Sequence, residues 1–227
     1  AQPIAPFDYG TKTDAELVAA LRHPNKWHRQ TALRILHDRA DPGLAKRLTT
    51  AFAKASGQLA LETFWAINAS GGFTDEFAIK QLSHPDEMIR YWTLRLIGDK
   101  RSESPAVVTA LITSAKSEKT SEVRAQLAST ARRLSGKSSL PIIRQLLAAD
   151  ADADDIHIPL LVWWALEKQA VGHRDEIVRL FEDSTLWSTT LSERFIVSRL
   201  GQRYTAERTD ANLVTAARLL ALAPDEQ

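Results

Sequence analysis

The chain has 227 residues, 44% of them hydrophobic, which is enough to bury the core of one or two globular domains. It contains no cysteine, so disulfides, thiolate metal sites, a cysteine nucleophile and haem attachment through CxxCH are excluded within these residues. Its 29 basic and 28 acidic residues give a net charge of +1, without the basic excess of a dedicated nucleic-acid-binding protein. No apolar run approaches the roughly 20 residues of a membrane-spanning helix, so we expect no direct membrane insertion.

The first ten residues, AQPIAPFDYG, differ in composition from the remainder of the chain. Prolines, a glycine and small residues are typical of a linker rather than of a packed element. The stretch also lacks the charged and apolar regions of a secretory signal peptide. We therefore expect residues 1–10 to form a linker and residues 11–227 to form a single domain.

Two long segments of the chain are ungapped copies of one another. LRHPNKWHRQTALRILHD (21–38) aligns with LSHPDEMIRYWTLRLIGD (82–99). The matched positions pair His23 with His84, Pro24 with Pro85 and Arg29 with Arg90. Two further apolar segments, PGLAKRLTTAFAKA and GQLALETFWAINAS, lie between the copies. The spacing therefore predicts repeating units of roughly 30 residues, each a helical hairpin.

Weaker copies follow along the rest of the chain. VRAQLASTARRL (123–134) places Arg124 where the earlier copy has Arg90. The later segments are SLPIIRQLLAAD, IHIPLLVWWALEKQA, HRDEIVRLFED, TLSERFIVSRLGQ and AERTDANLVTAARLLALA. Apolar residues recur in them every three or four positions, which is helical spacing, and glycines or prolines separate them. We expect an all-α fold: a right-handed α-solenoid of about five helical hairpins plus a terminal helix.

The repeating unit resembles a HEAT repeat, in which the second helix begins near a proline that an arginine follows five residues later. The proline would set the start of that helix, and its apolar stripe would be buried against neighbouring hairpins. We expect the recurrent arginine to bond an acidic residue or backbone carbonyls of a neighbouring unit. The alternative is a basic stripe on a concave surface.

The most unusual stretch is DADADDIHIPLLVWWALEK (150–168). Its aspartates begin with the spacing of a calcium-binding EF-hand loop, but Asp155 stands where the loop needs glycine and Leu161 where it needs glutamate. An aspartate before a helix with a proline in its first turn is instead typical of an N-cap. We expect Asp154, Asp155 and His157 to form an acidic cap on a buried helix. A weak metal site and a polar contact to a partner are the alternatives.

The sequence carries no recognisable catalytic motif. The six histidines lack the HExxH spacing of zinc sites, and no GxSxG or phosphate-binding loop is present. His23 and His84 occupy the same repeat position, which favours a turn role over catalysis. His157 could form an acid–base couple with Asp155, but no nucleophile accompanies it. We predict no catalytic residues, no metal ligands and no cofactor in this segment.

Six tryptophans and the recurrent arginines define the candidate contact residues. We expect three tryptophans in the core, namely Trp65, Trp92 and Trp164. The others are expected to be half exposed, namely Trp27, Trp163 and Trp187. Exposed aromatic residues and arginines are enriched at protein interfaces. The candidate interaction surface consists of Arg29, Arg34, Arg90, Arg95, Arg124, Trp27 and Trp163.

The amino-acid sequences of the repeats resemble one family in particular. Four segments are similar to the HEAT-repeat region of large haem-binding CxxCH proteins from planctomycete- and verrucomicrobia-type bacteria, which are named membrane-bound dehydrogenases. These segments are LRHPNKWHRQTALRILHDR, WAINASGG, LSHPDEMIRYWTLRLIGD and DADDIHIPLLVWWALE. The similarity spans roughly residues 11–223. In that family the region lies between a sugar-dehydrogenase-like β-propeller and a cytochrome c domain. The resemblance implies a periplasmic or otherwise extracytoplasmic connecting scaffold, with the electron transfer in its neighbours.

We therefore expect a non-catalytic scaffold whose partners are proteins rather than nucleic acid, within a parent oxidoreductase. The alternative is a HEAT-like DNA glycosylase or another nucleic-acid-binding solenoid. Its candidate residues would be Trp27, Trp92, Arg29, Arg90, Arg95, Arg124 and Asp99. The near-neutral charge counts against it, because phosphate neutralisation dominates duplex affinity. A lyase- or hydroxylase-type enzyme is a third hypothesis, with only His157, Asp154 and Asp155 as candidates.

Overall fold

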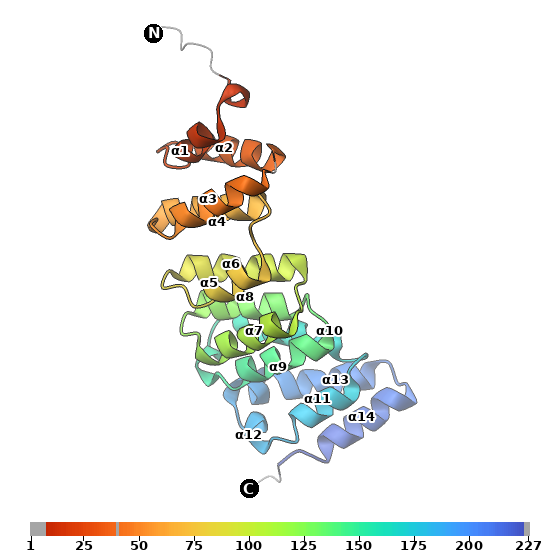
Figure 1. Cartoon of the computed structure of the whole chain (residues 1–227). Helices are drawn as coiled ribbons and strands as arrows, with labels where there is room; N and C mark the ends of the chain where they lie inside the picture. Colours follow the sequence, from red (N-terminus) through yellow and green to blue (C-terminus); the bar gives the residue numbers. More distant parts are fainter. Residues whose placement is uncertain (1–7, 40, 225–227) are drawn as a thin grey trace, which may run out of the picture. The chain divides into compact units, whose positions relative to one another are not determined.

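The computed structural model describes residues 8–39 and 41–224, and every regular element among them is helical. The chain divides into two compact units, Ala1–Lys80 and Gln81–Gln227. Each unit is built of stacked helices in the manner of an α-solenoid, so the predicted all-α fold is confirmed (Figure 1). The right-handed twist and the single domain stay predictions.

Unit 1 starts with a packed turn and continues with two helical pairs. Its elements are η1 (Tyr9–Thr11), α1 (Asp14–Ala20), α2 (Lys26–Arg39), α3 (Pro42–Phe52), α4 (Gly57–Ala69) and most of α5 (Asp75–Gln81). Residues 1–7 of the expected linker lie outside the described residues. Tyr9 is buried and its hydroxyl lies 2.7 Å from Nδ1 of His28, so packed structure begins at Tyr9 rather than at residue 11.

The ends of the helices in unit 1 follow from local sequence. Thr13 and Glu16 form a capping box at the start of α1, where each side chain bonds the other's backbone N–H. Gly71, with φ of 77°, follows the end of α4 in a conformation that glycine adopts without strain. Phe52, Phe64 and Phe77 then stack in the core that α3, α4 and α5 enclose, with ring centroids about 6 Å apart.

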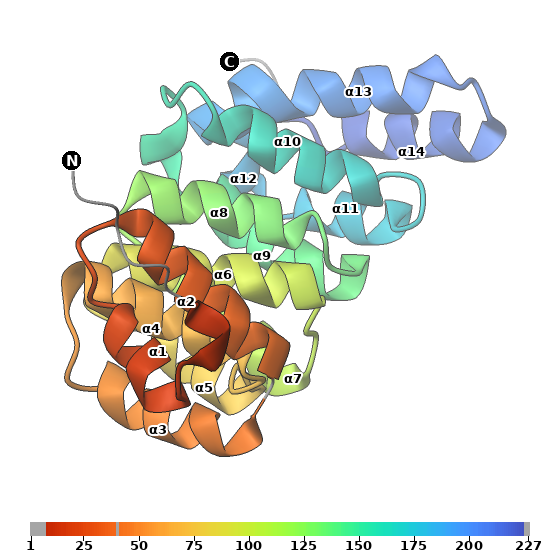
Figure 2. The same ribbon diagram turned by 90° about the horizontal axis from the view of Figure 1, so that it is seen from above.

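Unit 2 contains the remaining helices. They are α6 (Glu87–Lys100), α7 (Pro105–Ser117), α8 (Ser121–Ala131), α9 (Gly136–Leu147), η2 (Asp150–Asp152), α10 (Ile158–Gln169), α11 (Arg174–Leu180), α12 (Ser184–Trp187), the π-helical turn η3 (Ser192–Ile196), α13 (Val197–Ala206) and α14 (Asp210–Leu220). Figure 2 shows α8, α10 and α13 running side by side. The sequence predicted a plain helix over residues 190–202, whereas the structure has the π-helical turn before α13.

The first part of unit 2 has two layers of helices. One layer consists of α6, α8 and α10, and the other consists of α7, α9 and α11, with contacts between neighbours in each layer. Buried hydrogen bonds join successive helices of the first layer: the hydroxyl of Thr130 donates to the carbonyl of Leu94 at 2.8 Å. The amide of Gln169 donates to the carbonyl of Leu134. These bonds fix the register of the stack because an unpaired buried polar group is costly.

The last helices pack onto α10 and α11. Tyr204 of α13 is fully buried, and its hydroxyl donates to the carbonyl of Ala170 at the end of α10, at 2.9 Å. Burial raises the pKa of Tyr204 to about 12. Helix α14 contacts α11 and α13. Within the described residues no helix is long and apolar enough to cross a membrane.

Candidate functional site

The repeated histidine and proline build one turn twice. Nδ1 of His23 accepts the backbone N–H of Asn25, and Nδ1 of His84 accepts that of Asp86, each at 3.0 Å. The Asn25 and Asp86 side chains in turn accept the N–H two residues later and begin α2 and α6. The turn role of the two histidines is confirmed. The proline lies within this turn, and the asparagine or aspartate caps the helix instead.

An arginine one turn into the helix that follows this turn forms hydrogen bonds with the turn. Nη1 of Arg29 donates to the carbonyl of His23 at 2.9 Å, and Nη1 of Arg90 donates to that of His84 at the same distance. Arg124 repeats the bond to the carbonyl of Glu118 at 3.1 Å. In each case the acceptor lies six residues earlier. The guanidinium therefore satisfies a carbonyl of the turn that leads into its own helix.

The same three arginines also bind a carboxylate further along the chain. Arg29 bonds Glu62 of α4 through Nε at 2.8 Å, within unit 1. In unit 2, Arg90 donates from Nε and Nη2 to the two oxygens of Glu118, and Arg124 does the same to Asp152. We call each set of carbonyl and carboxylate bonds an arginine clamp. The expected pairing of the recurrent arginine with an acidic residue of a neighbouring unit is confirmed, whereas the carbonyls that it bonds belong to the turn before its own helix.

The clamp is charge-assisted and mostly shielded from water. Burial alone would raise the pKa of Glu118, but the hydrogen bonds from Arg90 and Thr120 lower it below its ordinary value. The hydrogen bonds that Arg124 donates to Asp152 raise the pKa of Arg124. The hydrogen bonds therefore stabilise the ionised carboxylate of Glu118 and the protonated guanidinium of Arg124. Bidentate arginine–carboxylate pairs of this kind fix geometry as well as charge.

The three clamp arginines differ from the other two arginines of the candidate surface. Arg34 is exposed on α2, and Arg95 is partly exposed and forms a 3.3 Å ion pair with Asp99 one turn later. Asp99 also lies 3.4 Å from Nη1 of Arg133, which links α6 to the residues after α8. Arg34 and Arg95 thus present side chains to solvent, whereas Arg29, Arg90 and Arg124 are engaged within the fold.

Every aspartate of the acidic stretch has an intramolecular partner. Asp150 accepts the hydroxyl of Thr190, Asp152 is clamped by Arg124, and Asp154 pairs with Arg194 at 2.8 Å. Asp155 accepts the N–H groups of His157 and Ile158 at 2.8 and 2.9 Å. These two bonds lower the pKa of Asp155. Of the predicted cap residues, only Asp155 bonds the start of the helix, which begins at Ile158 with Pro159 in its first turn. His157 holds the N-cap position without a side-chain cap bond, and Asp154 pairs with Arg194 instead.

The two adjacent tryptophans have the opposite solvent exposure to that predicted from the sequence. Trp163 is 8% exposed and lies in the core, whereas Trp164 is 45% exposed. The prediction placed them the other way round and was wrong, because one residue turns a helix by about 100° and α10 is apolar on both sides of that boundary. Trp65 and Trp92, expected in the core, are only partly buried.

Trp164 belongs to an exposed apolar stripe. Leu160 and Trp164 lie four residues apart and so share one side of α10, and Ile156 lies in the bend just before the helix. Ile156 is 81% exposed and Leu160 is 39% exposed. In unit 1, Trp27 is 54% exposed and packs edge-on against Tyr9 and His28, which agrees with its predicted half exposure.

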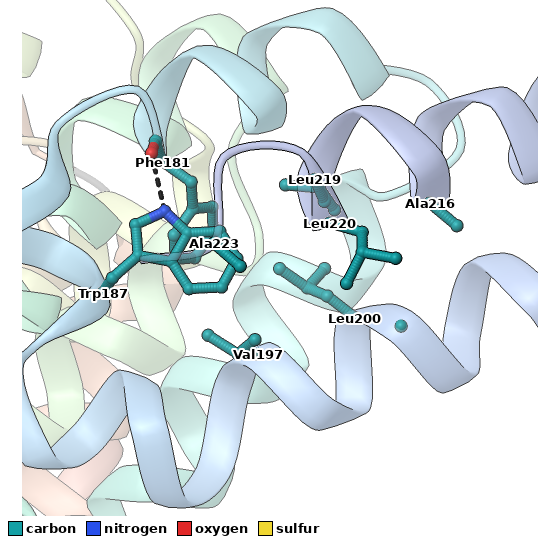
Figure 3. Close-up of a pocket in the computed structure, with 9 residues that line it drawn as sticks. Phe181, Trp187, Val197, Leu200, Ala216, Leu219, Leu220 and Ala223 are labelled. Atoms are coloured by element: carbon teal, nitrogen blue, oxygen red, sulfur yellow. Dashed lines mark hydrogen bonds between the residues drawn. The ribbon is translucent and has the colours of Figure 1, made fainter. Parts of the chain in front are cut away.

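Hollows on the described part of the chain differ in chemistry. A pocket of about 210 Å³ is lined mainly by apolar side chains (Figure 3). An open cleft of about 700 Å³ between α9 and α11 carries charged residues that largely pair with one another, as Arg179 does with Glu176. A hollow of about 350 Å³ beside the first clamp is lined in part by His23 and Arg29. No group of three metal-binding side chains is found in the part of the chain that the structure describes.

The apolar pocket is a feature that the sequence analysis missed, which we call the α13–α14 pocket. It is lined by Phe181, Trp187, Val197, Leu200, Gly201, Ala216, Leu219, Leu220 and Ala223. Figure 3 shows Leu200 and Leu220 pointing into the same space from the two helices, with Ala223 beside the rings of Phe181 and Trp187. The signal for it was present as a three- and four-residue apolar spacing in both helices, but that spacing also describes a buried core.

Comparison with known proteins locates the repeat within this fold. Residues 76–157 match the family model for HEAT repeats. This part of the chain is therefore similar to HEAT repeats. The matched residues contain the clamps of Arg90 and Arg124 and the acidic stretch, and HEAT repeats generally serve as scaffold or interaction elements. A search of curated proteins finds no match to the chain.

Proposed function

We propose that this chain is a non-catalytic scaffold that binds proteins through the exposed side of its helical stack. The observation that carries the proposal is the stripe of Ile156, Leu160 and Trp164, three apolar side chains that are exposed to solvent on α10 and in the bend just before it. Apolar residues in contiguous exposed positions mark interaction sites, and an exposed tryptophan is a frequent anchor residue. The arginine clamps support the role, because they hold the helices that carry the stripe in fixed register.

The charged groups of the chain also favour a binding role over chemistry. A general acid or base needs a group that can approach a substrate. Glu118, Asp152 and Arg124 are instead engaged in clamps, and Asp155 is occupied as a helix cap. The clamp arginines are likewise committed within the fold, which reduces the positive charge available for the phosphates of a nucleic acid.

The resemblance to haem-binding CxxCH proteins supplies the proposed context. We infer that the scaffold connects a dehydrogenase-like β-propeller to a cytochrome c domain of an extracytoplasmic oxidoreductase, and that the haem belongs to the neighbour. The gene that encodes the chain should then also encode a propeller and a CxxCH motif. Reading that gene is the direct test of the context, and a gene with neither neighbour would contradict it.

The binding role is tested by calorimetric titration of the chain with the separately produced propeller and cytochrome domains. We expect saturable binding to at least one of them. Trp164→Ala should weaken it about tenfold or more, because an anchor residue carries a large share of the binding energy. The matched control is Lys116→Ala, which removes an exposed side chain from α7, outside the candidate interaction surface. Absence of binding to both domains would overturn the proposal.

A further inference from the structure

The clamp of unit 1 leaves one arm of its arginine unused. Arg90 and Arg124 each donate from Nε and Nη2 to both oxygens of a carboxylate, and from Nη1 to a carbonyl of the turn. Arg29 donates from Nε to a single oxygen of Glu62 and from Nη1 to two carbonyls of the turn. Among the contacts of the described residues its Nη2 has no acceptor. The guanidinium therefore keeps one donor arm for a further partner.

Arg29 lines the hollow of about 350 Å³ in unit 1, which we call the Arg29 hollow, together with other hydrogen-bond donors. Arg22 lies in the turn after α1, is exposed, and has no hydrogen-bond or ion-pair partner for its side chain within the described part of the chain. Nδ1 of His23 accepts the N–H of Asn25, so the proton of the neutral imidazole is on Nε2. None of the residues that line the hollow is acidic.

The charges around the Arg29 hollow do not balance. The carboxylate of Glu62 is 1% exposed, and its Oε1 accepts both Nε of Arg29 and the side-chain amide of Gln58, each at 2.8 Å. It thus neutralises Arg29, whereas the charge of Arg22 has no such partner among the described residues. Two arginines against one glutamate leave one positive charge. A ligand that carries one negative charge would balance it.

The remainder of the lining is hydrocarbon, contributed by Leu21, Pro24 and Leu59. An inorganic anion would leave this surface uncovered, and a wholly apolar ligand would remove the arginine donors from water without replacing their bonds. The volume of about 350 Å³ lies at the lower end of the range of small-molecule pockets, about 300–1,000 Å³. The lining therefore suits a small organic anion with an apolar body.

The second copy of the repeat shows that the fold does not need these donors. In the alignment of residues 21–38 with 82–99, Arg22 stands where the second copy has Ser83. The second copy forms the same histidine turn and the same clamp, but all three arms of Arg90 are bonded within the fold. The free cation and the free guanidinium arm are thus additions of the first copy, and both belong to the lining of one hollow.

We propose that the Arg29 hollow binds a small organic carboxylate with a hydrocarbon body. The carboxylate oxygens accept hydrogen bonds from Nη2 of Arg29 and from the guanidinium of Arg22, whose planar forks match the geometry of a carboxylate. The hydrocarbon body lies against the leucines and the proline of the lining. This ligand site goes beyond the proposed scaffold function and is independent of it, since it lies in unit 1 and uses none of the α10 stripe.

The experiment is ¹⁹F NMR titration of the full chain with 4-fluorobenzoate, a carboxylate on an apolar ring. We expect saturable binding with a dissociation constant on the order of 1 mM, as for a ligand of this size. 4-Fluorobenzamide, which has the same shape and no charge, should bind about tenfold more weakly. Arg22→Ser, which introduces the residue of the second copy, should also weaken binding about tenfold because a charge-assisted hydrogen bond is lost. Arg34→Ser is the matched control: it removes an exposed arginine of the same unit that does not line the hollow.

The location of the probe is read from ¹⁵N-resolved amide shifts of the same samples. They should move at residues 21–29 and 58–59, and shifts confined to the α13–α14 pocket would overturn the proposal. So would equal binding of 4-fluorobenzamide, equal binding by Arg22→Ser, or no saturable binding at millimolar concentrations. Displacement of 4-fluorobenzoate by equimolar inorganic phosphate would assign the hollow to phosphate groups and reject the carboxylate. Failure of this site leaves the scaffold function standing, because that function is measured separately with the propeller and cytochrome domains.

Discussion

Arg124 of α8 donates to both carboxylate oxygens of Asp152, which ends the 3-10 turn before α10. The Asp152 side chain is only 2% exposed. The same guanidinium bonds the carbonyl of Glu118, whose own carboxylate holds Arg90. Two clamps of unit 2 thus meet at one residue, and the turns before α8 and α10 are joined to the helices that precede them.

Removal of one member of the Arg124–Asp152 pair should strongly destabilise the chain. Arg124→Ala leaves the buried Asp152 carboxylate without its partner, and the loss of one partner of a buried pair costs about 3–5 kcal/mol of the free energy of unfolding. Urea unfolding followed by circular dichroism measures it. The control is Arg95→Ala, which removes a partly exposed ion pair worth about 0–1 kcal/mol. A similar loss in both variants would contradict the special role of the clamp.

The stability of unit 2 should depend on the protonation of Glu118. The pKa of this carboxyl is lowered in the folded state, so the folded chain binds its proton less tightly than the unfolded chain. Its contribution is therefore fully present well above the unfolded pKa of about 4.3 and is lost as the pH falls through the lower folded pKa. Urea midpoints measured from pH 7 to pH 3 should fall in the acid part of this range.

Glu118→Gln isolates that contribution. The variant should be less stable at pH 7, and its stability should fall less steeply below about pH 4 because the titrating group is gone. Glu122→Gln is the matched control, since Glu122 is exposed and bonds only the neighbouring hydroxyl of Ser121 among the described contacts. An unchanged acid slope in Glu118→Gln would assign the pH dependence to other carboxylates.

How far the sequence predicts this structure is clearest at the clamps. The copied segments place Arg29 and Arg90 at one repeat position, and that periodicity correctly predicted the helices, the histidine turns and an acidic partner. The partner itself was not identified, because Glu62 lies 33 residues after Arg29 whereas Glu118 lies 28 after Arg90. The acceptors also lie at different places, Glu62 within α4 and Glu118 just after α7, so the repeat fixes the donor and leaves the acceptor to three-dimensional packing.

The error at Trp163 and Trp164 has a different physical origin. Both sides of α10 contain large apolar residues, so the amphipathic pattern that orients most helices is weak here. The α13–α14 pocket was missed for a related reason: apolar residues at helical spacing look the same in a sequence whether a neighbour covers them or not. Exposure, rather than residue type, distinguishes a core from a binding surface, and exposure depends on which helices are adjacent.

Substitution of Trp163 should affect the stability of the fold, whereas substitution of Trp164 should affect mainly binding. Trp163→Ala opens a cavity in the core and should lower the free energy of unfolding by about 3–5 kcal/mol. Trp164→Ala removes a side chain that is already 45% exposed, so its loss of stability should be much smaller. Thermal unfolding of both variants checks the difference. If Trp164→Ala were the more destabilising change, the assignment of the stripe as a free surface would be wrong.

Asp155 should stabilise α10 as its cap, and its neighbour Asp154 should contribute little. Asp155→Ala removes the acceptor for the N–H groups of His157 and Ile158 and should cost about 1 kcal/mol of the free energy of unfolding. Asp155→Asn should restore most of it, because asparagine caps nearly as well. Asp154→Ala removes only the exposed pair with Arg194 and should change stability by less than about 1 kcal/mol. Urea unfolding of the three variants, repeated with calcium, also tests a metal role: a calcium-dependent gain in stability that Asp154→Ala abolished would show that the stretch binds the ion in addition to capping the helix.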